Sequence, residues 1–261
     1  MKNEKWNKFD ELQGKCYSNM IGAEEDATCW KQAFELMMEI VREERQNNSN
    51  YALELVELDD VTDYEYDILG WLEDCLDEIG IEEEYESLLQ MCECLLNEFN
   101  WPEYTGSDIK FQKTVALGVL HREQEAAQFC EQWISTEPEN VIAAAAGVTA
   151  YIGIRNFEAA EELVDRFIPD KSKCVEENDV MFMAASALYQ VMGRKKEKIQ
   201  VEKAMKAYEK ELQKQFEMET LGDELDFLDD DEFPFLSNGG FLTDDDWLED
   251  EFDEDEDLPF D

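Results

Sequence analysis

The feature that most constrains the fold is a repeat of helix, turn and helix with a period of 34 residues. Residues 141–168 read VIAAAAGVTAYIGIRNFEAAEELVDRFI, which predicts a helix of small residues, a short break and an amphipathic helix. The segment 115–134 aligns with residues 149–168 at an offset of 34 and places Ala126 over Ala160. A repeated helix pair of this size cannot bury its apolar face alone, so the pattern predicts a stack of such pairs.

This arrangement resembles the tetratricopeptide repeat, a 34-residue unit of helix, turn and helix. The matching positions are Ala116, Ala126 and Pro138 in repeat 107–140, Ala150, Tyr151, Phe157 and Ala160 in repeat 141–174, and Tyr189 and Gly193 in repeat 179–212. Three positions differ from the family pattern. Leu117 replaces the usual Tyr, His121 replaces the Gly of the turn, and Lys198 replaces the Ala at which the helices pack. The resemblance, which covers residues 107–212, implies an all-α fold in which antiparallel helix pairs stack as an α-solenoid, and it implies a scaffold that binds a protein.

Residues 1–106 are expected to form helices and less regular helix hairpins. Apolar residues three and four apart predict one helix over residues 27–46 and a hairpin over residues 63–99. In that hairpin we expect Asp63 to be the N-cap of the first helix and Gly80 to be its C-cap. Whether this region contains true repeats is left open by the sequence.

The third region, residues 213–261, differs in composition. Residues 222–261 hold 19 Asp or Glu and no Lys or Arg, so like-charge repulsion predicts a mostly disordered tail. Large apolar residues interrupt the acidic run, and a tail that served only solubility would not need them. The residues expected to contact a partner are Phe233, Phe235, Phe241, Trp247 and Phe252.

Net charge limits the partners. A formal charge of −45 repels phosphates and anionic lipid and attracts basic proteins, so we expect no direct nucleic-acid or membrane binding. No apolar run is long enough to cross a bilayer, and no secretion signal is evident at the start. The seven cysteines are scattered and odd in number, which favours a reducing, cytoplasmic setting.

Residues that could carry chemistry are few. His121 is the only histidine, and nothing near it in the sequence completes a catalytic arrangement. Cys92 and Cys94 lack the spacing of a redox or zinc motif and point to different faces of a helix, so core filling is the better interpretation. We therefore expect no enzyme, no cofactor and no metal site.

The resemblance also implies a concave groove lined by the first helix of each repeat. The positions that carry over are Phe111, Val115 and Gly118, then Ala145, Thr149 and Ile152, then Met183, Ala187 and Gln190. They are mostly small or apolar, and they lack the Lys, Arg and Asn set with which some relatives grip a peptide carboxylate. An apolar groove for a hydrophobic or helical segment is one interpretation. Packing of these residues against neighbouring helices is the other, and the sequence favours neither.

Three hypotheses for function remain, and all leave the oligomeric state open. The chain is an adaptor or chaperone-like scaffold that binds a basic client or an apolar segment. Alternatively, its own tail occludes the groove, and its carboxylates meet lysines of one helix, namely Lys195, Lys196, Lys198, Lys203, Lys206 and Lys210. In the third hypothesis the acidic surface mimics DNA and captures a nucleic-acid-binding protein.

Overall fold

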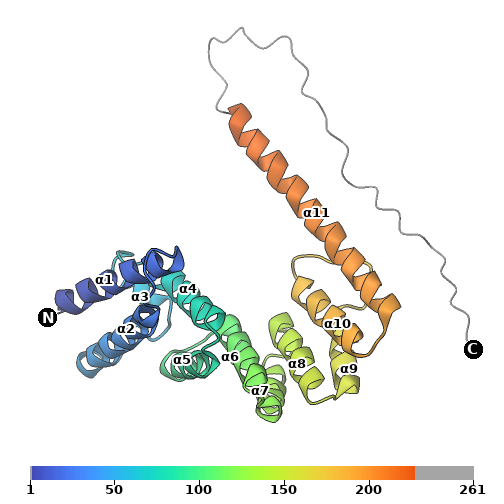
Figure 1. Ribbon diagram of the computed structural model, residues 1–261, viewed down its shortest axis with the longest axis horizontal. Helices are drawn as coiled ribbons and strands as arrows, with labels where there is room; N and C mark the ends of the chain where they lie inside the picture. Colours follow the sequence, from blue (N-terminus) through green and yellow to red (C-terminus); the bar gives the residue numbers. More distant parts are fainter. Residues whose placement is uncertain (1, 227–261) are drawn as a thin grey trace, which may run out of the picture. The chain divides into compact units, whose positions relative to one another are not determined.

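The computed structural model describes residues 2–226, with side chains from residue 4 to residue 216, and shows an all-α protein (Figure 1). Within this range the helices are α1 (Lys2–Met20), α2 (Thr28–Asn47), α3 (Glu57–Asp60), α4 (Ile68–Ile81), α5 (Tyr85–Glu98), α6 (Ser107–Val119), α7 (Glu123–Thr136), α8 (Val141–Gly153), α9 (Phe157–Phe167), α10 (Asp179–Val191) and α11 (Lys195–Asp226). The described residues form no strand beyond one isolated bridge between Glu54 and Asn100.

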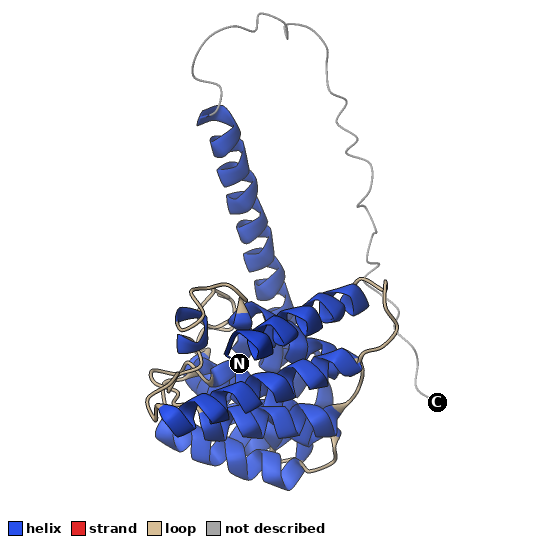
Figure 2. Cartoon of the chain, turned by 90° about the vertical axis from the view of Figure 1, so that its left-hand side faces the viewer, coloured by secondary structure: helices blue, strands red, loops and turns tan. Residues whose placement is uncertain are grey.

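The helices pack in chain order. Helix α1 packs against α2, both α2 and α3 pack against α4, and each helix from α4 to α9 packs against the next. In addition, α8 contacts both α6 and α10. Figure 2 shows several of these helices lying side by side. This stacking confirms the predicted all-α fold of helix pairs arranged as an α-solenoid. Residues Met1–Gln213 form one compact unit, and a second unit begins at Lys214.

Aromatic residues join the first helices into a core. The ring of Phe9 meets that of Trp71 edge-on at 4.9 Å between centroids, and Trp30 stacks on Trp71 at 6.3 Å. Trp6 and Leu12 are buried beside Phe9. The region before the clearest repeats is therefore well packed, although its sequence matches the repeat pattern poorly.

Four helices end in the same way, and this fixes which positions are equivalent. Directly after α4, α6, α8 and α10 come Glu83, His121, Arg155 and Gly193, each with a left-handed φ between 57° and 70°. The next residue donates its backbone N–H to a carbonyl five residues back, as in Arg122 N to Leu117 O at 2.9 Å. This is the Schellman motif, which satisfies carbonyls that a helix end leaves free.

The following helix begins two residues after each left-handed residue, at 85, 123, 157 and 195. The left-handed residues lie 38, 34 and 38 positions apart, counted from 83 to 121, 155 and 193. The offset of 34 is thus correct for the step that the sequence revealed. The pair α4–α5 follows the same plan, with longer connections on either side of the central step.

Two expected caps of α4 are wrong. Asp63 lies in a turn with φ of 55°, and α4 begins only at Ile68. The first backbone amide of α4 is bound by the buried residue Asp59. Asp59 Oδ1 accepts a hydrogen bond from Ile68 N at 2.7 Å. Gly80 is inside the helix, and the left-handed position that favours glycine is occupied by Glu83 instead.

Candidate binding surface

Two hollows lie between the first helices of successive pairs, and each is also lined by the start of the second helix of the earlier pair. The α6–α8 hollow has a volume of about 210 Å³ and is lined by Thr114, Val115, Gly118, Val119, Glu123, Ala126, Thr149, Ala150 and Gly153. The α4–α6 hollow has a volume of about 400 Å³ and is lined by Leu76, Asp77, Gly80, Ile81, Tyr85, Leu88, Gln112 and Val115. Val115 contributes to both, so it forms the ridge between them.

The two hollows are built from equivalent positions. Counted from the left-handed residue that ends α4 or α6, the glycines Gly80 and Gly118 both lie three residues before it. The aliphatic pair Ile81 and Val119 lies two residues before it, exposed by 69% and 46%. The repeat therefore places the same kind of opening at two successive steps of the stack.

Glycine keeps these openings clear. A Cβ added at Gly118 would meet nothing within 4 Å, and one at Gly80 would only touch Leu88 Cδ2 at 3.9 Å. Gly147 is different, because a Cβ there would lie 2.6 Å from Ile134 Cδ1. A larger residue at 147 would therefore force the side chains of Ile134 and Leu163 to shift, whereas at 80 or 118 no neighbour would have to move.

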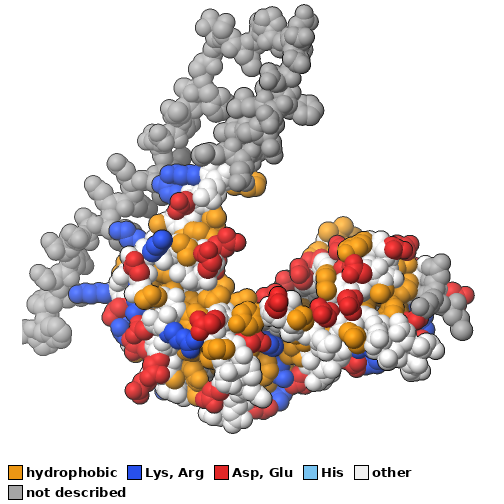
Figure 3. Space-filling view, turned by 180° about the vertical axis from the view of Figure 1, so that it is seen from behind, with side chains coloured by type: hydrophobic (Ala, Val, Ile, Leu, Met, Phe, Trp, Pro, Cys, Tyr) orange, Lys and Arg blue, Asp and Glu red, His pale blue; other side chains and the backbone are white. Residues whose placement is uncertain are grey.

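A third hollow continues the surface. It has a volume of about 200 Å³ and shares Leu76 with the α4–α6 hollow. Leu69, Leu72, Trp101 and Ile109 give it an apolar lining. Figure 3 shows one face of the molecule, on which exposed apolar and acidic side chains lie side by side.

The residues predicted to line a groove are brought together only in part. Val115, Gly118 and Thr149 line the α6–α8 hollow. Phe111 and Ile152 are half-buried against the core. Ala145 is buried with 2% exposure, so its side chain does not reach the surface.

On α10 the predicted groove residues Met183, Ala187 and Gln190 are exposed. They stand at positions equivalent to Phe111, Val115 and Gly118, because all lie ten, six and three residues before a left-handed residue. The predicted positions thus share one side of the stack. The repeat pattern does not point to Gly80, Ile81 or Tyr85, and Gly80 was expected to be a helix cap.

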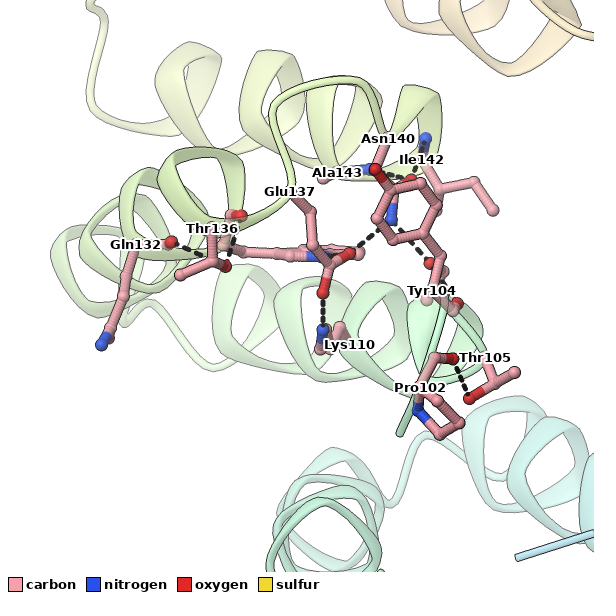
Figure 4. Close-up of polar contacts among 12 residues, drawn as sticks. Pro102, Tyr104, Thr105, Lys110, Gln132, Thr136, Glu137, Asn140, Ile142 and Ala143 are labelled. Atoms are coloured by element: carbon pink, nitrogen blue, oxygen red, sulfur yellow. Dashed lines mark hydrogen bonds and ion pairs between the residues drawn. The ribbon is translucent and has the colours of Figure 1, made fainter. Parts of the chain in front are cut away.

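A polar network holds α6 against the turn between α7 and α8 (Figure 4). The Nδ2 of Asn140 donates to Ser107 Oγ at 2.8 Å and to Glu137 Oε2 at 2.7 Å. The same carboxylate accepts from Trp133 Nε1 at 2.7 Å and pairs with Lys110. Since α6 and α8 form the walls of the hollow, this network fixes its frame.

The network also sets the charge state of Glu137. Burial alone raises the pKa of this carboxyl, but hydrogen bonds from Lys110, Trp133 and Asn140 together outweigh burial, and the pKa lies below its usual value. The carboxylate is therefore ionised and fully partnered at neutral pH. It is a structural group of the frame.

Basic side chains gather on α11. Lys195, Lys196, Lys203, Lys206 and Lys210 are exposed, and no ion pair joins these five to another described residue. At 100° per residue they lie opposite buried Val201 and Ala204. Lys198, by contrast, is half-buried and pairs with Glu202 at 3.3 Å. The lysines named in the sequence are thus mostly available to an acidic group.

The cysteines are free thiols, and all but Cys94 are buried. Burial raises the pKa of Cys130 to about 11 and that of Cys92 to about 12, which makes both poor nucleophiles. Cys92 is buried while Cys94 lies 3.2 Å from Arg42 Nη2, so the two point to different surroundings as predicted. Cys92 fills the core as predicted, whereas Cys94 is only partly buried at the edge of the core.

His121 stands where the repeat normally has a turn glycine. Its side chain is 89% exposed, and Nδ1 lies 3.5 Å from Glu123 Oε1. Among the described residues, no three His, Cys, Asp or Glu side chains form a group that could hold a metal ion. Across the same part of the chain, no helix has the length and apolar character that crossing a bilayer requires.

The expected tail contacts Phe233, Phe235, Phe241, Trp247 and Phe252 lie outside the described residues. So does the expectation of disorder for most of that region.

Comparisons with models of known protein families, with curated proteins and with solved structures give no match.

Proposed function

We propose that the protein is a non-enzymatic scaffold for protein–protein interaction, of tetratricopeptide type, whose first helices bind a segment of a partner protein. One observation carries this proposal. Two equivalent apolar hollows open side by side on the surface where such repeats would place their ligand, and Val115 joins them. We place the scaffold in the cytoplasm, because its cysteines are scattered and odd in number.

The lining of the hollows supports burial of apolar groups. In the α6–α8 hollow, Val115, Val119 and Ala126 surround a single carboxylate, that of Glu123. Burying one aliphatic side chain is worth about 1.5–3 kcal/mol, so two such contacts supply about 3–6 kcal/mol of the roughly 8 kcal/mol that micromolar binding requires. Contacts that flank the hollows must supply the rest and offset the cost of association.

A test uses the full-length chain as bait for a phage-displayed library of random 16-residue peptides. We expect peptides to be enriched over an unrelated acidic protein. We expect Thr149→Arg, which places a long charged side chain in the hollow, to weaken the binding of synthetic copies of these peptides at least tenfold.

Gln132→Arg is the matched control, because Gln132 is exposed on α7 outside both hollows and the charge change is the same. Equal loss in both variants, or no enrichment at all, contradicts the scaffold.

The lysines of α11 favour a second candidate function, the binding of an acidic segment. Five exposed lysines share one face of this helix in a chain that is otherwise strongly acidic. Exposed ion pairs contribute only about 0–1 kcal/mol each, so such binding is expected to be weak and to be lost in salt. Replacing Lys203, Lys206 and Lys210 by Gln would abolish it and leave peptide binding at the hollows unchanged.

A further inference from the structure

The glycines of the two hollows indicate what the partner segment looks like. Glycine within a helix is less favourable than alanine by about 1 kcal/mol, so the first question is whether packing explains the two glycines. At Gly118 there is open space where a Cβ would stand, and at Gly80 there is only ordinary contact. Packing within the fold does not explain these two residues. The space that they leave is available to a side chain from outside.

The third step of the stack shows what happens without glycine. There Ile152 occupies the position equivalent to Gly80 and Gly118, and Phe157 follows in place of Tyr85 and Glu123. Both are half-buried and pack against the core. The protein's own apolar side chains therefore fill the position of a hollow at this third step. Two equivalent hollows, those between α4 and α6 and between α6 and α8, stay open to a ligand.

The charge around the hollows selects the sign of the partner. Each hollow contains one carboxylate, Asp77 or Glu123, and no basic side chain. Beside the α4–α6 hollow, Glu82 and Glu83 add two exposed carboxylates, while the neighbouring Glu84 pairs with Lys31. Such a rim favours lysine and arginine and opposes an acidic segment.

We infer, on the basis of the proposed function, that the occupant is a basic amphipathic segment of a partner protein. It places one aliphatic or aromatic side chain in each of the two hollows and flanks them with Lys or Arg. Val115 separates the two side chains. The chain's own residues 227–261 carry the wrong charge for this surface, which distinguishes the inference from occlusion by the tail.

The experiment compares full-length variants against the same random 16-residue peptide library. Among peptides enriched by the unaltered protein, we expect more Lys or Arg together with Leu, Ile, Met or Phe, and fewer Asp or Glu, than in the starting library. Their affinity should fall as NaCl is raised. Glu123→Gln should reduce that salt dependence.

Gly118→Leu fills the α6–α8 hollow and should raise the Kd of these peptides at least tenfold, with no fall in the urea midpoint of unfolding. Gly14→Leu is the matched control, because Gly14 is also an exposed helical glycine with nothing within 4 Å of an added Cβ. It should leave the Kd unchanged.

The outcomes separate the inference from the proposed function. The inference would be overturned if the selected peptides lacked basic and aliphatic enrichment and bound Gly118→Leu as tightly as Gly14→Leu. The proposed scaffold function would still stand if Thr149→Arg abolished the binding of the same peptides. Enrichment of acidic peptides like residues 227–261 would also overturn it. If no peptide is enriched, both fail.

Discussion

At the scale of single residues, buried Asn140 links three parts of the chain. Its Oδ1 accepts from Ile142 N at 3.0 Å and Ala143 N at 3.2 Å, which caps α8, and its Nδ2 reaches Ser107 and Glu137. A side chain that both caps a helix and satisfies buried polar groups is costly to remove, because every partner loses its hydrogen bond at once.

We therefore expect Asn140→Ala to lower the free energy of unfolding by about 2–4 kcal/mol. Urea denaturation followed by circular dichroism measures it. The control is Asn156→Ala, since Asn156 caps α9 through one longer bond, 3.4 Å to Ala159 N, and is exposed. Asn156→Ala should lower the free energy of unfolding by about 1 kcal/mol or less. Equal costs would mean that the network contributes nothing beyond a cap.

Glu137 gives the stability a dependence on pH. Its pKa in the folded protein lies below the ordinary 4.5, so ionisation stabilises the fold above pH 4.5 and this contribution is lost as pH falls through the folded pKa. We expect Glu137→Gln to be less stable than the unaltered protein at pH 7. The difference between their free energies of unfolding in urea should narrow steadily below pH 4.5. A difference that is constant from pH 7 to pH 3 would contradict this role.

At the scale of elements, the ends of α4, α6, α8 and α10 matter most. Three of the four left-handed residues are not glycine, although side chains disfavour this conformation. The Schellman motif forms at these three residues nevertheless, because its hydrogen bonds stabilise the sharp turn into the next helix. At these positions a glycine would relieve strain.

We expect His121→Gly to raise the free energy of unfolding by about 0.5–1 kcal/mol, because glycine adopts φ of 57° without steric cost. The reverse change, Gly193→Ala, should lower it by a similar amount, since φ is 70° there. Thermal and urea unfolding of both variants check the opposite signs. A loss of stability in His121→Gly would show that the exposed imidazole contributes more than the strain that it imposes.

The elements could be predicted from the sequence where apolar residues recur along one face. Residues 27–46 gave α2 almost to the residue, and His121 was placed correctly at the turn. The cap of α4 was missed because its acceptor, Asp59, comes from a separate short helix, so no local pattern points to it. The equivalence of α4–α5 with the later pairs was hidden because the steps are 38 and not 34 residues.

For the candidate surface, the repeat pattern located Val115, Gly118 and Thr149, which do meet in one hollow. It could not reveal that Gly80 and Gly118 are equivalent, because this depends on where two helices end in space. Nor could it show that Ala145 is buried, since the pattern fixes a face of the helix and not the depth of each side chain.

At the scale of the whole molecule, the stack is acidic over most of the described chain and basic along one face of α11. The acidic surface favours a basic partner and the basic face of α11 favours an acidic one. The two surfaces can therefore bind different partners independently. We propose that the first of them, at the hollows between α4, α6 and α8, binds a partner segment.

The measurement that tests this claim most directly is photo-cross-linking of the full-length protein to a library-selected peptide that carries benzophenone at an apolar position, followed by mass-spectrometric mapping. We expect adducts within residues 76–88, 112–123 and 149–153, and we expect an excess of unlabelled peptide to prevent their formation. Specific adducts confined to residues 195–210, or spread evenly over the chain, would contradict it.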